Sequence, residues 1–362
     1  MVLAEPVDWK LAERVAVRLS GTDPFASSYH ATSLASDFAE LTAQAEALVT
    51  AETGLVPDGP ARAQVVDRAE WISNNIASFQ RMLRPVTDRL GPKLNGPTAP
   101  VARGLAGTEV GSLLGLLSKR VLGQYDLLMN ESEDRSKQDV VSYVGPNILA
   151  IEKRYAFAPR EFRLWLALHE VTHRAQFTGV PWMRKHFLDL MNRTLSTADP
   201  DPKRFLEALK RAVAAVRDGR NPLDEGGIIG LLADSDQRTA LDGIGGLMSL
   251  LEGHGDVTMD RAGAHLLPSA PRFSSVLRQR RESTGAAKLL RQLAGIEAKM
   301  RQYEEGEQFI AAIEAQRGIR FIDHAWASAT NLPTLVEIRD PQLWIGRLEA
   351  AGVISTAVGD GR

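Results

Sequence analysis

The sequence predicts a mainly α-helical α+β fold with a small β-sheet. Apolar residues recur at three- and four-residue steps through most of the 362-residue chain, which is the spacing of one helical face. Two short segments, Gly123–Leu128 and Val140–Val144, instead contain Tyr and Val with the partial alternation of strands. Nothing in the sequence repeats internally, so repeat architectures are not indicated.

The helical pattern appears in separate stretches along the chain. Helices are predicted over residues 32–53, 61–86, 108–120, 159–178, 237–259, 273–294 and 297–317, and the final segment ends in another. Residues 88–100 are rich in Gly, Pro and Asn and are predicted to form a loop. The two strands are separated by an acidic turn at Asn130–Asp139, which predicts a hairpin.

Composition excludes several classes of protein. Lys and Arg total 43 against 45 for Asp and Glu, so no net charge attracts nucleic acid or a membrane surface. There is no cysteine, which excludes disulfides, iron–sulfur clusters, thiolate zinc sites and a cysteine nucleophile. Neither a signal peptide nor an apolar run of about 20 residues is recognisable, which predicts a cytoplasmic location and no membrane partner.

Residues 159–178 form the clearest predicted helix. Pro159 suits the first helical position, and Glu161 places a negative charge in the first turn, where the helix dipole favours it. Gly179 allows the helix to end, and Pro181 prevents its continuation. A helix with both ends marked in this way is predicted to hold its side chains in fixed directions.

This helix contains a motif with metal-binding chemistry. Residues 169–173 read His-Glu-Val-Thr-His, and positions four apart project from one face of a helix. Two neutral imidazoles at this spacing can bind one Zn2+ ion, so His169 and His173 are predicted metal ligands. Glu170 is predicted to be the catalytic carboxylate, because it can reach a metal-activated water without itself being a ligand.

A catalytic zinc ion needs a third protein ligand and one open position. Residues 252–256 read Glu-Gly-His-Gly-Asp, and Glu252 and Asp256 share one face if this segment is helical. Glu252 is the favoured third ligand, with His254 as the alternative, and Asp256 is predicted to accept the free N–H of a ligand histidine. Tyr303 could stabilise an oxyanion, although packing is the favoured interpretation because nothing local places it near the metal.

Several segments together resemble a family of bacterial zincin-like proteins. The resemblance extends from Val7 to Trp344 and is carried by HEVTHRAQF at 169–177, PW at 181–182, LEGHGDVTMD at 251–260, KMRQYEEGEQF at 299–309 and NLPTLVEI at 331–338. Members are labelled hydrolases or zinc-dependent metalloproteases, and one branch is labelled as associated with biosynthesis of a deazaflavin coenzyme. Gly255 stands where this family usually has Ala, which weakens the helix locally and removes no reactive group.

The resemblance implies a zincin-like core, in which a small sheet lies beside the motif helix and further helices surround both. The expected organisation is one domain over residues 1–362, with an N-terminal helical part at 1–100 and a catalytic core with the metal site at 101–362. The expected activity is hydrolysis of a peptide or small amide by metal-activated water. The alternative is a non-catalytic zincin-like protein that binds a partner and keeps a structural metal.

Overall fold

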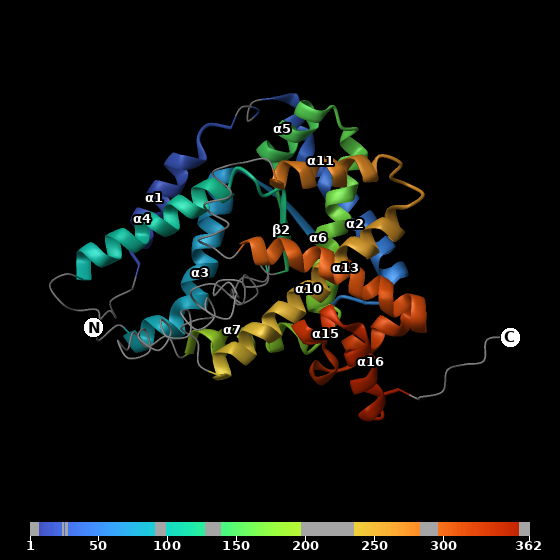
Figure 1. The fold of residues 1–362 in the computed structure, drawn as a ribbon. Coiled ribbons are helices and arrows are strands. Elements are labelled where there is room, and N and C mark those ends of the chain that lie inside the picture. The colour runs from blue at the N-terminus through green and yellow to red at the C-terminus, as the bar shows by residue number, and fades with distance from the viewer. Residues whose placement is uncertain are drawn as a thin grey trace. The chain divides into compact units, whose positions relative to one another are not determined.

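The computed structural model describes residues 7–23, 25, 28–90, 99–126, 139–196, 235–282 and 296–354. The chain forms two compact units, each made of two segments. The first unit comprises Met1–Gly179 and Thr258–Leu277, and the second comprises Val180–Val257 and Arg278–Arg362. Helices form most of the described residues, and the strands form one small sheet, so the predicted α+β class is confirmed (Figure 1).

The sheet belongs to the first unit and has three strands. They are β1 (Arg62–Val66), β2 (Gly123–Tyr125) and β3 (Val140–Val144), in the order β1-β3-β2. β2 pairs antiparallel with β3, which confirms the predicted pairing, while residues 130–138 of the expected turn lie outside the described residues. β1 pairs parallel with β3, so β2 forms one edge of the sheet.

The prediction of one helix over residues 61–86 was wrong at its start. Residues Arg62–Val66 form β1, and helix α3 begins only at Arg68 and runs to Leu90. The backbone N–H of Glu70 donates to a side-chain oxygen of Asp67 at 2.8 Å, which caps the new helix. Val66 lies opposite Val144 in the parallel pair, so pairing with a distant strand outweighed the local helical spacing.

Among the described residues, seven further helices lie wholly or partly in the first unit. They are α1 (Trp9–Ser20), α2 (Tyr29–Thr53), α4 (Ala99–Leu117), α5 (Gly145–Tyr155), α6 (Pro159–Thr178), the end of α10 (Ser235–Gly263) and the start of α11 (Ala270–Glu282). α4 begins well before the predicted residue 108, and α5 was not predicted. Residues 88–90 and 99–100 of the expected loop are helical instead, since they belong to α3 and α4, and residues 91–98 lie outside the described residues.

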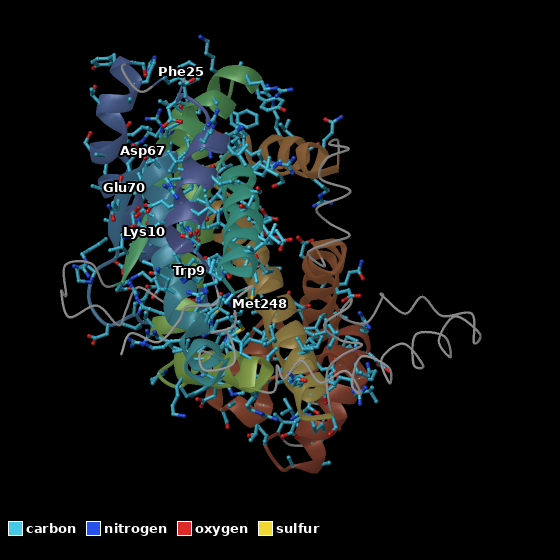
Figure 2. All side chains as sticks on the ribbon, turned by 90° about the vertical axis from the view of Figure 1, so that its left-hand side faces the viewer. Trp9, Lys10, Phe25, Asp67, Glu70 and Met248 are labelled. Atoms are coloured by element: carbon cyan, nitrogen blue, oxygen red, sulfur yellow. The ribbon has the colours of Figure 1, made fainter. Side chains whose placement is uncertain are left out.

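Helices α1 and α4 pack closely through a row of glycines. A Cβ atom at Gly111 would lie 2.4 Å from the carbonyl oxygen of Ala12, and Cβ atoms at Gly107 and Gly115 would lie 2.5 Å and 2.7 Å from the carbonyl oxygens of Asp8 and Ala16. Trp9 of α1 is buried in a hydrophobic core cluster, whereas Lys10 is exposed (Figure 2). The glycines of α4 therefore allow α1 to approach at backbone distance.

Helix α6 runs through the core of the first unit. Its observed limits, Pro159–Thr178, are those predicted from the sequence. It packs against α2, α5 and the two strands β2 and β3. Near its start, Phe162 and Trp165 pack with Phe157 and Phe273 in an aromatic cluster whose ring centroids lie 4.7–6.1 Å apart. The helix is therefore held on several sides by buried apolar surface.

The second unit is helical throughout its described part. It contains α7 (Met183–Ser196), most of α10 with Met248 (Figure 2), the end of α11, α13 (Ile296–Arg317), α14 (His324–Ala327), α15 (Leu335–Arg339), α16 (Pro341–Ala350) and two short 3-10 turns at Ile319–Asp323 and Ala329–Asn331. α10 and α13 match the predicted helices at 237–259 and 297–317. None of the helices found in the described part of the chain is long and apolar enough to cross a membrane.

Candidate metal centre

The imidazole rings of His169 and His173 approach each other on one face of α6. Their Nε2 atoms lie 3.3 Å apart, and their rings are nearly perpendicular, at 85°. Two nitrogens bound tetrahedrally to one zinc ion at about 2.0–2.1 Å would lie about 3.3 Å from each other. The measured separation fits that geometry, so the two imidazoles are placed as a pair of zinc ligands would be.

Gln176 orients the second histidine. Its side-chain oxygen lies 2.9 Å from Nδ1 of His173, and its side chain is fully buried. An amide oxygen can only accept, so this contact assigns the ring proton to Nδ1 and leaves the Nε2 lone pair for a metal. A partner of this kind fixes both the tautomer and the ring direction of a ligand histidine.

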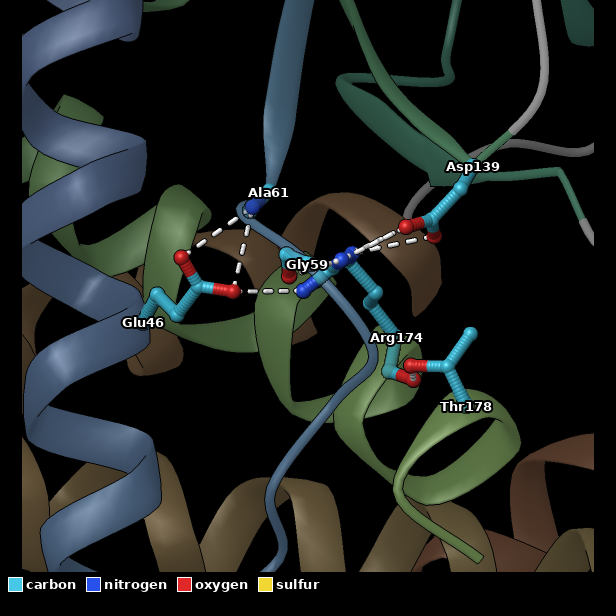
Figure 3. A network of polar contacts seen from close by, with 6 residues as sticks. All are labelled: Glu46, Gly59, Ala61, Asp139, Arg174 and Thr178. Atoms are coloured by element: carbon cyan, nitrogen blue, oxygen red, sulfur yellow. Dashed lines mark hydrogen bonds and ion pairs between the residues drawn. The ribbon is translucent and has the colours of Figure 1, made fainter. Parts of the chain in front are cut away.

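Arg174, which follows His173 on α6, is held by several polar contacts with other segments. Arg174 is completely buried and donates to Glu46 of α2, to both carboxylate oxygens of Asp139 and to the carbonyl of Gly59 (Figure 3). Two carboxylates and a carbonyl thus surround one guanidinium, which is the pairing that a buried cation requires. Burial alone would lower the pKa of Arg174, but Asp139 and Glu46 raise it, so the group stays charged.

Glu170 lies on α6 between the two histidines and is only 7% exposed. Its carboxylate oxygen Oε2 accepts the backbone N–H of Tyr125 on strand β2 at 3.0 Å. A Cβ atom at Gly123 of the same strand would lie 2.6 Å from the other carboxylate oxygen. The carboxylate of Glu170 therefore contacts β2, the edge strand of the sheet.

Tyr143 on the central strand β3 lies within the electrostatic reach of Glu170. Its ring stacks on Phe38, with centroids 3.9 Å apart, and its hydroxyl shares a hydrogen bond of 2.8 Å with Thr42. Burial raises the pKa of the Tyr143 phenol, and the negative charge of Glu170 adds to the rise. Tyr143 is consequently a neutral, structural member of the core near the site.

Glu252, the favoured third ligand, belongs to the second unit, whereas both histidines belong to the first. Its role as a metal ligand remains a prediction. Glu252 is 6% exposed and lies on α10, which is helical as predicted.

The other residues considered near Glu252 have different surroundings. His254 is buried, and its ring meets Trp326 edge-on with centroids 5.0 Å apart. Asp256 is half-buried on the same helix. The side chain of Tyr303 lies outside the described residues. The expected roles of His254 and Asp256 remain predictions.

Sequence reasoning did not find Gln176, Gly123 or Tyr125. Gln176 carried a usable signal, because it follows His173 by three residues and so shares its helical face. The two residues of β2 carried none, since Tyr125 meets Glu170 across a separation of 45 residues. Only the tertiary structure brings that strand to the helix.

The fold and this helix define a class of protein: a mainly helical α+β protein with a His-Glu-x-x-His motif on a helix that packs against a small sheet. The model of the zincin-like metallopeptidase family matches residues 7–345. The chain therefore belongs to the zincin-like metallopeptidase family, and the expected resemblance is confirmed.

A solved structure is similar over nearly the whole chain. It comes from Chloroflexus aurantiacus and is described as "a putative hydrolase with a novel fold". It is 31% identical in sequence, has a TM-score of 0.70, and the match covers 95% of this chain and 99% of that one. No curated protein matches this chain.

Proposed function

We propose that the protein is a zinc-dependent hydrolase that cleaves a peptide or related amide bond. The observation that carries the proposal is the 3.3 Å separation of Nε2 in His169 and His173, with Glu170 buried on the helical turn between them. Membership of the zincin-like metallopeptidase family supports both the metal and the class of substrate.

In this proposal His169, His173 and Glu252 hold the zinc ion. Two neutral imidazoles and one carboxylate leave a net positive charge on the ion and one position open for water, as catalytic zinc sites require. The burial of Glu252 on α10 and the chemistry of the donors, two imidazoles and one carboxylate, support this ligand set. Asp256 is proposed to support a ligand histidine, since it follows Glu252 by one helical turn.

The chain's own groups would carry the proton during hydrolysis. Zinc, when bound, polarises the scissile carbonyl and lowers the pKa of a water molecule to about 7. Glu170 is the proposed general base that takes the proton of the attacking water and later delivers it to the leaving amine. Gln176 keeps the proton of His173 on Nδ1, so that Nε2 faces the metal throughout.

Peptide hydrolysis by the zinc-loaded, full-length protein tests the proposal. The probes are a mixture of synthetic peptides and a set of N-acyl amides, with the products identified by mass spectrometry. We expect the wild-type protein to cleave peptides, and Glu170→Gln to bind zinc normally while its turnover falls by about 1,000-fold or more. Glu109→Gln, on the exposed face of α4, is the matched control and should keep full activity.

Two results would contradict the proposal. If Glu170→Gln cleaved its probes at the wild-type rate, Glu170 could not be the general base. If the protein bound zinc tightly and cleaved neither probe set, the non-catalytic alternative with a structural metal would replace it. Cleavage of acyl amides without cleavage of peptides would retain the mechanism and narrow the substrate to small amides.

A further inference from the structure

The edge strand β2 touches the carboxylate of Glu170 in two places. The N–H of Tyr125 donates to Oε2 at 3.0 Å. A Cβ atom built on Gly123 would lie 2.6 Å from Oε1 and 2.8 Å from Cδ. These distances are well inside the separation of about 3.5–4.0 Å at which such atoms attract each other. The observed position of this carboxylate therefore requires a residue without a side chain at position 123.

The backbone at position 123 does not itself demand glycine. The described glycines with a positive φ are Gly21, Gly54, Gly59, Gly318 and Gly352. Gly123 is not among them, so an alanine could adopt its backbone conformation without strain. The three atoms nearest to a Cβ atom at this position all belong to the Glu170 side chain.

Other contacts hold β2 in place. Gly123, Gln124 and Tyr125 pair in register with β3, and the indole N–H of Trp71 donates to Gln124 at 2.7 Å. The ring of Tyr125 stacks on Phe177 of α6, with centroids 6.4 Å apart. A methyl group at position 123 would therefore displace the flexible carboxylate more readily than the paired strand.

We propose that β2 positions Glu170 for catalysis, with Gly123 leaving the space and the Tyr125 amide fixing one carboxylate oxygen. Gly123 is then a positioning residue that acts through Glu170. This inference rests on the proposed hydrolase function. A general base must lie within hydrogen-bond reach of the proton it takes, and a displacement of about 1 Å can cost about 100-fold in rate.

A double-mutant cycle tests the inference in the zinc-loaded, full-length protein. We expect Gly123→Ala to lower kcat by about 100-fold, with KM changed by less than about twofold and zinc content unchanged. In the Glu170→Asp background, the same substitution should cost less than about threefold, because the shorter side chain leaves room for the methyl group. Equal losses in both backgrounds would mean that alanine merely distorts β2, and would overturn the inference.

The same variants give a readout that needs no substrate. Gly123→Ala should lower the unfolding midpoint by about 2–8 °C when residue 170 is Glu, and by less than half of that when it is Asp. Gly104→Ala is the control, since a Cβ atom there would meet only Leu11, at 3.9 Å. Equal shifts in the two backgrounds would overturn the proposed contact.

The two readouts separate the possible failures. If the wild-type protein cleaves no probe but the midpoints are coupled, the hydrolase function fails, and the catalytic role of Gly123 fails with it. If the wild-type protein is active but both cycles are additive, only the inference about β2 fails. Coupling in both readouts supports the proposal.

Discussion

The side-chain oxygen of Gln176 lies 2.9 Å from Nδ1 of His173, on the same face of α6. The side chain of Gln176 is fully buried, and its removal would deprive Nδ1 of His173 of this acceptor. His173 would then be free to change its tautomer and to rotate. A ligand nitrogen must present its lone pair to the metal, so we expect the hydrogen bond from His173 to Gln176 to increase the affinity for the metal.

Substitution of Gln176 should therefore weaken zinc binding without abolishing it. We expect Gln176→Met, which keeps the side-chain length, to lower zinc affinity by about 10- to 100-fold. Competition with a chromogenic chelator measures the change. Gln342→Met, at an exposed position on α16, is the control. Unchanged affinity in Gln176→Met would show that the hydrogen bond does not orient His173.

Removal of the buried guanidinium of Arg174 should destabilise the protein strongly. Arg174→Met leaves Glu46 and Asp139 without their shared cation, and losing one partner of a buried ion pair costs about 3–5 kcal/mol. Urea denaturation measures the free energy of unfolding. Arg160→Met breaks an ion pair with Glu40 that is well exposed on both sides, and should change the midpoint little. Similar losses in the two variants would contradict this account of Figure 3.

The close packing of α1 on α4 predicts an unusual penalty for alanine. In a helix, Gly→Ala normally stabilises by about 0.5–1 kcal/mol. At Gly111 the added methyl group would lie 2.4 Å from the Ala12 carbonyl, so Gly111→Ala should instead destabilise by about 1–3 kcal/mol. Gly104→Ala, on the same helix, should follow the normal trend. The midpoint of thermal unfolding, measured for both variants, tests this prediction. A higher midpoint for Gly111→Ala would contradict the proposed packing.

The first turn of α15 predicts a pH-dependent contribution to stability. Burial would raise the pKa of Glu337, but hydrogen bonds from Arg347 and from the Thr334 amide outweigh it and lower the pKa below 4.5. A carboxyl whose pKa is lower in the folded state stabilises above its unfolded pKa, and this stability is lost as pH falls through the folded pKa. Glu337→Gln should thus destabilise the protein at pH 7, and the difference should shrink as pH falls below about 5. Urea denaturation at a series of pH values measures it, and a difference that stayed constant as pH fell would contradict the assignment.

The sequence predicts the parts of the site that depend on local spacing. Pro159 and Gly179 mark the ends of α6, and the four-residue step between His169 and His173 puts both rings on one face. These features need only helical geometry, and the structure agrees with them. The helical conformation around Glu252 was likewise predicted from local pattern.

The features that the sequence does not reveal arise from contacts between distant segments. β1 was predicted as helix, because its five residues form a strand only through the parallel partner β3. The contacts of Glu170 with Gly123 and Tyr125 form only because the same sheet lies beside α6. A local pattern cannot report such pairings, since the residues share no periodicity.

Anomalous diffraction at the zinc absorption edge, from crystals of the zinc-loaded full-length protein, tests the central claim most directly. The account predicts a peak about 2.0–2.1 Å from Nε2 of both His169 and His173, and about 2.0–2.2 Å from a carboxylate oxygen of Glu252. A zinc ion found elsewhere, with nothing bound between the two imidazoles, would contradict it.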